Sequence, residues 1–156
     1  MVPGHPSFPG CACPSWQPTL LDMTSTRFMS TAGEGVELTV PDATITVRIS
    51  GEDTDGAYEL FEVDAPRGEA APPHRTPWPK VYYVLHGRMA VLLDGELHDL
   101  SPGGAVVIPP NAPHTFTVHT PSVQFLAFAV GALMGAFFRD LSANGFEALE
   151  RHGVTL

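Results

Sequence analysis

The sequence is poor in basic residues and in cysteine, and each shortage excludes a class of protein. Its 156 residues hold 8 Lys and Arg against 17 Asp and Glu, a formal net charge of −9. Binding to nucleic acid or to anionic lipid depends on clustered positive charge, so neither is an expected partner. Two cysteines are too few for a disulfide framework.

A long hydrophobic run is also missing. The apolar stretch VQFLAFAVGALMGAFF is shorter than the ~18 residues that a membrane-spanning helix needs, and Gln124 interrupts it. A buried strand that runs into a helix explains the stretch better. Apolar residues in its second half recur at three- and four-residue spacing: Leu133, Met134, Phe137, Phe138 and Leu141. The segment SANG predicts the end of this helix, with Gly145 as its C-terminal cap.

Residues 1–30 are rich in proline and glycine and show no hydrophobic period. We therefore expect a flexible N-terminal extension, of which residues 1–22 are optional if the ordered part starts at Met23. Cys11 and Cys13 lie in this extension and supply only two metal ligands, so we interpret them as free thiols. The segment lacks the charged start and continuous apolar run of a signal peptide, and the expected location is the cytoplasm.

From Val36 onward, apolar and polar residues alternate with the period of two that is typical of strands. The predicted strand segments are VELTVPDATITVRIS, YELFEV, KVYYVLH, MAVLLDG, ELHDL, AVVIPP, HTFTVHT and VQFLAFAV. Between two of them, Asp94 and Gly95 predict a tight hairpin. The sequence therefore predicts one all-β domain, residues 31–156, an antiparallel sandwich or barrel with a C-terminal helix.

Two segments resemble the two sequence motifs of the cupin family. They are GEAAPPHRTPWPKVYYVLHG, from Gly68 to Gly87, and GGAVVIPPNAPHTFTV, from Gly103 to Val118. The matching positions are Gly68, His74, Gly87, Gly103, Pro109 and His114. The resemblance implies a double-stranded β-helix, the jelly-roll barrel of the cupins, with a C-terminal helix similar to that of quercetin-dioxygenase-like cupins. It also implies a small-molecule substrate in the barrel cavity and a homodimer.

The departures from the family pattern concern the metal ligands. Thr76 stands where the family has a second histidine and Lys80 where it has a glutamate, so only His74 and His114 remain of four ligands. A +1 charge about 4 Å from a +2 ion costs roughly 8 kcal/mol at an effective dielectric constant near 20. We therefore expect no metal cofactor. The alternative is Fe, Mn, Ni, Cu or Zn bound by the two histidines with an unforeseen third ligand such as Glu62.

Asn111 replaces the glycine of the second motif. Asparagine also tolerates the left-handed backbone conformation that such a turn can require, so we expect the turn to be kept.

Strand alternation places Lys80, Tyr82 and Val84 on one face, which the family pattern puts inside the barrel together with His114 and Phe116. We expect burial to lower the pKa of Lys80, which suits a general acid, a general base or an amine nucleophile. The predicted catalytic residues are Lys80, His114 and His74, and the predicted substrate-binding residues are Thr76, Tyr82, Phe116 and Trp78. In the competing interpretation, Lys80 is solvated at the barrel mouth and the two histidines only pack.

The resulting hypothesis is a metal-independent enzyme of acid/base chemistry: isomerisation, cyclisation, dehydration or elimination. Its substrate would be a small carbonyl-bearing or cyclic metabolite, because similar cupins occur in bacterial secondary metabolism, including polyketide cyclisation. One alternative is a quercetinase-like dioxygenase that uses a metal on His74 and His114. The other is a cupin that binds a small molecule without turnover. His86, His98 and His119 are interpreted as surface residues.

Overall fold

The structure is a computed structural model that describes residues 29–69 and 71–156. The predicted N-terminal extension lies outside the described residues except for Met29 and Ser30, and so do Cys11 and Cys13. The extent of the domain therefore stays a prediction at this end of the chain.

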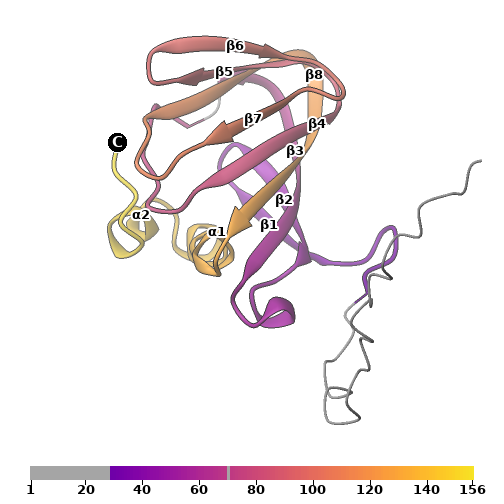
Figure 1. The fold of residues 1–156 in the computed structure, drawn as a ribbon, viewed down its shortest axis with the longest axis vertical. Helices are drawn as coiled ribbons and strands as arrows, with labels where there is room; N and C mark the ends of the chain where they lie inside the picture. Colours follow the sequence, from indigo (N-terminus) through magenta and orange to yellow (C-terminus); the bar gives the residue numbers. More distant parts are fainter. Residues whose placement is uncertain (1–28, 70) are drawn as a thin grey trace, which may run out of the picture.

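Strands dominate the described residues, and two helices follow them in the chain (Figure 1). The elements are β1 (Val36–Val40), β2 (Ala43–Ile49), the short 3₁₀ helix η2 (Glu52–Thr54), β3 (Tyr58–Glu69), β4 (Lys80–His86), β5 (Met89–Leu93), β6 (Glu96–Leu100), β7 (Ala105–Ile108), β8 (His114–Val130), α1 (Leu133–Asn144) and α2 (Glu147–Arg151).

All strand pairings are antiparallel and run in the order β1-β2-β3-β8-β4-β7, with β5 pairing with both β8 and β6. Strand β8 is 17 residues long and pairs with β3, β4 and β5, so it belongs to both halves of the barrel. This arrangement is the predicted all-β jelly-roll barrel.

Two predicted strand boundaries are wrong. HTFTVHT and VQFLAFAV form the single strand β8, because the extra residues near Pro121 bulge out of β8 opposite Pro66 and Gly68 of β3, and the pairing continues on both sides. Conversely, VELTVPDATITVRIS divides into β1 and β2, because the chain turns at Pro41 and Asp42 and pairs the two halves with each other.

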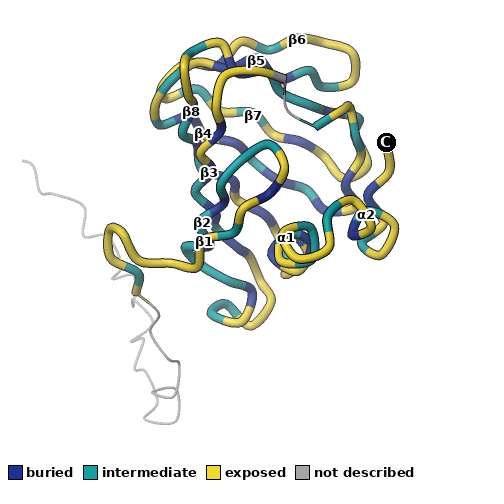
Figure 2. The backbone as a smooth tube through the Cα atoms, turned by 180° about the vertical axis from the view of Figure 1, so that it is seen from behind, coloured by how far each residue is buried: buried dark blue, intermediate teal, exposed yellow. Residues whose placement is uncertain are grey.

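Burial alternates along the strands, as the sequence period predicts (Figure 2). In β4, Lys80, Tyr82 and Val84 are buried while Tyr83 between them is exposed. The buried apolar residues of the strands form one continuous core with those of α1 and α2. Burial of this apolar surface is the main term that stabilises the barrel.

Two predicted turns are confirmed by backbone angles. Asp94 and Gly95 both have positive φ, 50° and 81°, and they join β5 to β6 in a two-residue hairpin. Asn111 has φ of 62°, so the asparagine does adopt the left-handed conformation that a glycine would supply.

The predicted helix is α1, and it ends as predicted, with the Gly145 N–H donating to the Leu141 carbonyl oxygen. It buries Met134 and Phe137 against the barrel, whereas Leu133, expected on the same side, is 55% exposed. Helix α2 follows directly and was not predicted. Both helices lie at the end of the barrel opposite the β5–β6 hairpin (Figures 1 and 2). Of the helices described, none is long and apolar enough to cross a membrane.

Helix α1 is held to the barrel by a buried carboxylate. Glu59 of β3 is almost completely buried, and its Oε2 accepts a hydrogen bond of 2.9 Å from the Gly135 N–H in the first turn of α1. Its Oε1 accepts a second one of 3.3 Å from the Gly51 N–H. Negative charge is favourable at a helix N-terminus, where N–H groups lack partners, so Glu59 caps α1 from a strand.

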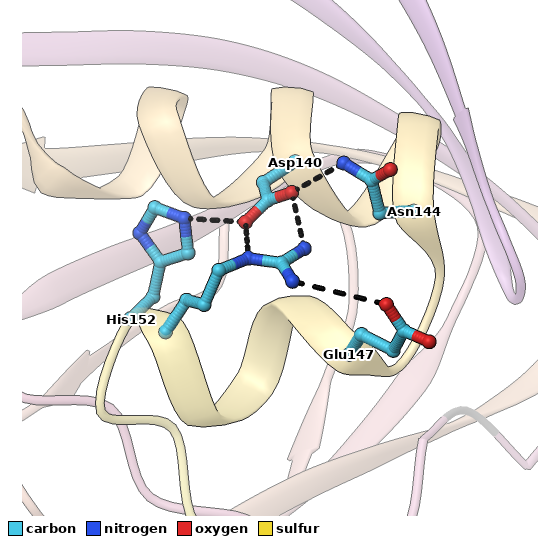
Figure 3. Close-up of polar contacts among 5 residues, drawn as sticks. Asp140, Asn144, Glu147 and His152 are labelled. Carbon is cyan, nitrogen blue, oxygen red and sulfur yellow. Dashed lines mark hydrogen bonds and ion pairs between the residues drawn. The ribbon is translucent and has the colours of Figure 1, made fainter.

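A polar cluster joins the two helices (Figure 3). The Asp140 carboxylate accepts hydrogen bonds from Arg151 Nε at 2.8 Å, Arg151 Nη2 at 2.7 Å and Asn144 Nδ2 at 2.7 Å. His152 Nε2 lies 3.0 Å from the same carboxylate, and Glu147 adds a 3.8 Å contact to Arg151. The bonds from Arg151 and Asn144 hold the pKa of Asp140 well below its ordinary value. We call these five residues the helix-end cluster.

Candidate functional site

A cavity of about 90 Å³ lies inside the barrel. Strands β4 and β8 and helix α1 supply an apolar and aromatic wall that includes Tyr82, Phe116, Phe125, Met134 and Phe138. Three ionisable side chains interrupt this wall: Asp42, His74 and Lys80. The cavity is smaller than a common ligand pocket of about 300–1,000 Å³, so it fits a small molecule or one end of a larger one.

Lys80 is the first residue of β4 and points into this cavity, only 4% exposed. The ion pairs among the described residues involve His119, Arg151 and His152, and Lys80 takes part in none of them. The Tyr82 ring lies 5.6 Å from Nζ. Burial without a counter-charge lowers the pKa of Lys80 to about 7, so neutral amine and ammonium coexist near neutral pH.

His74 and His114 lie side by side, with ring centroids 4.4 Å apart. Their backbones form a small antiparallel bridge: each N–H donates to the other residue's carbonyl oxygen. His74 Nδ1 lies 3.0 Å from the Pro72 carbonyl oxygen, and His114 Nδ1 lies 2.9 Å from that of Ala112. A carbonyl only accepts, so each Nδ1 carries the proton and each Nε2 presents a lone pair.

Both imidazoles are neutral. Burial, then the nearby Lys80, lowers the pKa of His74, and the same two causes lower the pKa of His114 to about 3. His114 is 2% exposed, and its Nε2 has no hydrogen-bond partner among the described residues. The pair therefore offers two proton acceptors next to an amine.

Tyr82 and Phe116 are both part of the cavity wall, where the sequence placed them. The Tyr82 ring packs against Phe125 at 4.9 Å and edge-on against Phe116 at 6.4 Å. Burial, followed by the charge of Asp42, raises the pKa of Tyr82, so its hydroxyl stays protonated. Such a hydroxyl can donate a hydrogen bond to a bound molecule.

Thr76 and Trp78 are buried, but the structure does not place them in the cavity wall. Thr76 Oγ1 donates to the Trp78 carbonyl oxygen at 3.3 Å, and the Trp78 ring packs on Phe137 of α1 at 5.6 Å. Their contacts support the loop that leads into β4, and their contact with a substrate stays a prediction.

Asp42 is a cavity residue that the sequence analysis missed. It follows Pro41 in the turn between β1 and β2, and its Oδ2 accepts a 3.0 Å hydrogen bond from the Ala71 N–H. Its negative charge acts on both His74 and Tyr82. A turn is the default place for an aspartate, so nothing in the local sequence distinguishes this one.

The donor atoms at this site do not fit a tightly bound divalent metal. Two Nε2 lone pairs are present, but within residues 29–69 and 71–156 no group of three or more His, Cys, Asp or Glu is arranged to hold a metal ion. Glu62 lies on the outer side of β3, where its Oε1 accepts a hydrogen bond from Gln124. Lys80 supplies a cation where a carboxylate would be needed.

The remaining histidines of the barrel lie away from the cavity. His86 and His119 are exposed, and His98 is partly buried on β6. His119 lies 3.9 Å from Asp99 at the surface. These positions agree with their interpretation as surface residues.

Fold and cavity together define a jelly-roll barrel with a lined interior. Residues 61–130 match the sequence profile of the cupin domain. The chain is also 25% identical, over 134 residues, to quercetin 2,3-dioxygenase of Bacillus subtilis strain 168. That alignment covers 85% of this chain but only 40% of the relative, so the chain spans about two fifths of the enzyme's length. Over residues 61–130 the chain therefore resembles the cupin domain, and the match covers a little under half of its length.

Solved structures show the same fold. The polyketide cyclase RemF from Streptomyces resistomycificus superposes with a TM-score of 0.58 at 24% identity, covering 67% of this chain and 79% of that one. KdgF from Halomonas sp. gives a TM-score of 0.61 at 23% identity, covering 68% and 94%. An RmlC-like cupin from Shewanella frigidimarina gives 0.59 at 16% identity, covering 69% and 93%. At these identities the likeness concerns the fold alone.

Proposed function

We propose that this cupin is a metal-independent enzyme that moves protons on a small carbonyl-bearing or cyclic metabolite. The observation that carries the proposal is Lys80: a buried, unpaired amine with its pKa near 7, next to two imidazoles with free Nε2 atoms. A general acid or base works best when its pKa is near the operating pH. Isomerisation, cyclisation, dehydration and elimination all consist of such proton transfers.

In the proposed reaction, neutral Lys80 takes a proton from a carbon next to the substrate carbonyl. The Tyr82 hydroxyl donates to the carbonyl oxygen, and His74 accepts and returns the proton that the product needs at another atom. The apolar wall excludes water, which strengthens each of these interactions. RemF is described as a polyketide cyclase, and a cyclisation of that kind is one of the reactions that the proposal includes.

A metal-dependent dioxygenase is the second candidate, because of the similarity to quercetin 2,3-dioxygenase. The two Nδ1 atoms are fixed by backbone carbonyls, as is usual for metal-binding histidines. This candidate needs a third ligand that the described residues do not supply, and it needs Lys80 to move away.

Metal content separates the two candidates. The full chain and its Lys80→Glu variant are expressed in cells supplied with Fe, Mn, Ni, Cu and Zn. Both proteins are then purified, and their metal content is measured by plasma mass spectrometry. The proposal expects less than about a tenth of an equivalent in the native protein and more in the variant, which regains a carboxylate. Near-stoichiometric metal in the native protein would overturn it in favour of the dioxygenase.

Proton transfer itself is measured by hydrogen–deuterium exchange. Cyclic ketones and β-dicarbonyl compounds are incubated with the protein in D₂O, and loss of the α-proton signal is followed by NMR. Catalysed exchange that survives a chelator supports the proposal. The matched control is Arg139→Met, a change on the exposed side of α1 that should leave the exchange rate unchanged. If no compound exchanges faster than in the control without protein, the chain is better described as a binding cupin.

A homodimer and a place in bacterial secondary metabolism are the finer parts of the proposal. Both come from the family resemblance. Analytical ultracentrifugation of the full chain tests the first.

A further inference from the structure

Lys80 is the single lysine of the whole sequence; the other seven basic residues are arginines. It is also almost completely buried and faces a cavity. An unpaired buried amine contributes less to stability than an apolar side chain of the same length, because its desolvation is not compensated. Packing therefore gives no reason for a lysine at this position, whereas a reaction that uses the amine does.

The property that distinguishes a neutral amine from other bases is that its nitrogen also attacks carbonyl carbon. A lysine in an apolar pocket is activated for this reaction because the neutral form becomes accessible near neutral pH. Arginine cannot replace it, since a guanidinium stays protonated.

Formation of an imine also needs a group that moves protons. The attack gives a carbinolamine, whose oxygen must be protonated before it leaves as water. His74 faces the same cavity as Lys80, with Nδ1 held by the Pro72 carbonyl and Nε2 free to accept a proton and return it. His114, in contact with His74, extends this relay.

The wall of the cavity indicates which carbonyl compounds fit. The rings of Tyr82, Phe116 and Phe125 pack edge-to-face or tilted around it, an arrangement that accepts a further planar ring. The Asp42 carboxylate in the same wall repels an anionic substrate and accepts a hydrogen bond from a hydroxyl group.

We propose that Lys80 captures an uncharged aromatic or conjugated aldehyde or ketone as a covalent imine. Nζ forms the C–N bond as the carbonyl π bond breaks, and one Nζ proton passes through His74 to the carbinolamine oxygen. The C–O bond then breaks as that oxygen takes the second Nζ proton and leaves as water, which gives a neutral imine that can take up a proton from solvent. No oxidant or reductant is needed. The inference rests on the proposed function and deepens it, because a protonated imine withdraws electrons from the neighbouring carbon and makes its proton easier to remove.

Reductive trapping tests the inference. The full chain is incubated at pH 7 with benzaldehyde and cyanoborohydride, followed by intact mass and peptide mapping. We expect a mass increase of one benzyl group, located on Lys80 and absent from Lys80→Arg. Peptide mapping distinguishes it from modification of the α-amino group. Hydroxybenzaldehyde is expected to react as well. The anion 4-formylbenzoate is expected to react much more slowly, because the Asp42 carboxylate repels it, and to react faster in Asp42→Asn.

The matched control is Arg139→Lys, which adds an ordinary exposed amine to α1 of the same chain. An exposed lysine with a pKa of ~10.4 has about 0.04% of its amine neutral at pH 7, whereas Lys80 with its pKa of about 7 has about half, so Lys80 should be modified about 1,000-fold faster. Equal rates at the two positions would overturn the inference. Reaction of Lys80 with formaldehyde but with no aromatic aldehyde would overturn the proposed class of substrate.

The outcome is separable from that of the proposed function. Catalysed proton exchange without any trapped adduct leaves the acid/base function standing and overturns the imine. A trapped adduct without catalysed exchange supports the imine and counts against the proton-transfer enzyme.

Discussion

The cavity and the helix-end cluster contain the same kinds of side chain in opposite states. In the cluster, Arg151 and His152 share the carboxylate of Asp140 near the surface, and each polar group has a partner. At the cavity, Lys80 is buried and forms no ion pair among the described residues, although Asp42 lies in the same wall, and the neighbouring His114 is buried with no partner at Nε2. The cluster is stabilised by paired charges, whereas burial at the cavity lowers the pKa of Lys80 and of His114 and so favours their neutral forms.

This difference separates a structural role from a chemical one. Pairing at the helix ends lowers the pKa of Asp140 and raises that of Arg151, so both stay charged, which suits a contact that holds α1 to α2 (Figure 3). Burial in the cavity moves the pKa of Lys80 to about 7, where a small change of environment moves the proton. Perturbed groups that lack partners are therefore the better indication of a functional site in this chain.

The largest expected effect comes from removing the amine. Lys80→Met should lower catalysed proton exchange by about 100-fold or more, the usual contribution of a general acid or base. The same change should raise the free energy of unfolding at pH 7, because an apolar side chain of similar length replaces a buried amine. Arg151→Met, in the helix-end cluster, should do the reverse: exchange is kept and stability falls. Equal loss of exchange in both variants would break the comparison.

The second effect is the pH dependence that Lys80 imposes on stability. Its pKa is about 7 in the folded protein and 10.5 ordinarily, so between these values the unfolded chain binds more protons than the native one. The free energy of unfolding must then rise with pH across this window, by about 4 kcal/mol at most. Urea unfolding at pH 7 and pH 10 should show this rise in the native chain relative to Lys80→Met. An identical pH dependence of the two proteins would contradict the buried, unpaired amine.

The third effect lies on the acid side. Folding lowers the pKa of His114 from 6.5 to about 3, so as pH falls below 6.5 the unfolded chain gains a proton that the native chain refuses. Stability is therefore lost between pH 6.5 and pH 3, by about 3 kcal/mol from this residue at pH 4. In His114→Gln the acid limb of the stability curve should be shallower. His119→Gln is the control, because that histidine is exposed and its removal should leave the slope unchanged.

The smallest effect is expected in the helix-end cluster. Asp140→Asn removes the charge that Arg151 and His152 share, and it should lower the melting temperature by a few degrees, since near-surface pairs stabilise little. Glu147→Gln, which affects one 3.8 Å contact, should leave the melting temperature unchanged. Loss of proton exchange in Asp140→Asn would show that the cluster and the cavity are coupled.

Local patterns in the sequence predicted the features that depend on local geometry. The alternation around Lys80 and Tyr82 put both on one face of a strand, and the family resemblance put that face inside the barrel. The Asp94-Gly95 pair predicted the hairpin, because turn type depends on adjacent residues. Only the family resemblance indicated that Lys80 and Thr76 occupy positions of metal ligands. Neither the local pattern nor the resemblance predicted that Thr76 lies outside the cavity wall.

Features that depend on distant contacts were missed. Asp42 reaches the cavity because the turn between β1 and β2 folds over Ala71, which lies 29 positions further along the chain. The tautomer of each imidazole, with the proton on Nδ1, is set by the carbonyls of Pro72 and Ala112, which no motif encodes. Strand β8 continues past Pro121 because the residues around this proline bulge out of β8 while its pairing with β3 resumes on both sides.

The contact between Glu59 and Gly135 has a consequence for the order of folding. A Cβ at Gly135 would fall on a Glu59 carboxylate oxygen, so alanine, which favours an isolated helix by about 1 kcal/mol, does not fit here. The start of α1 thus depends on a strand 76 positions earlier rather than on its own first turn. We therefore expect the first turn of α1 to form after β3 has joined the sheet, because only then does the Gly135 N–H gain its partner.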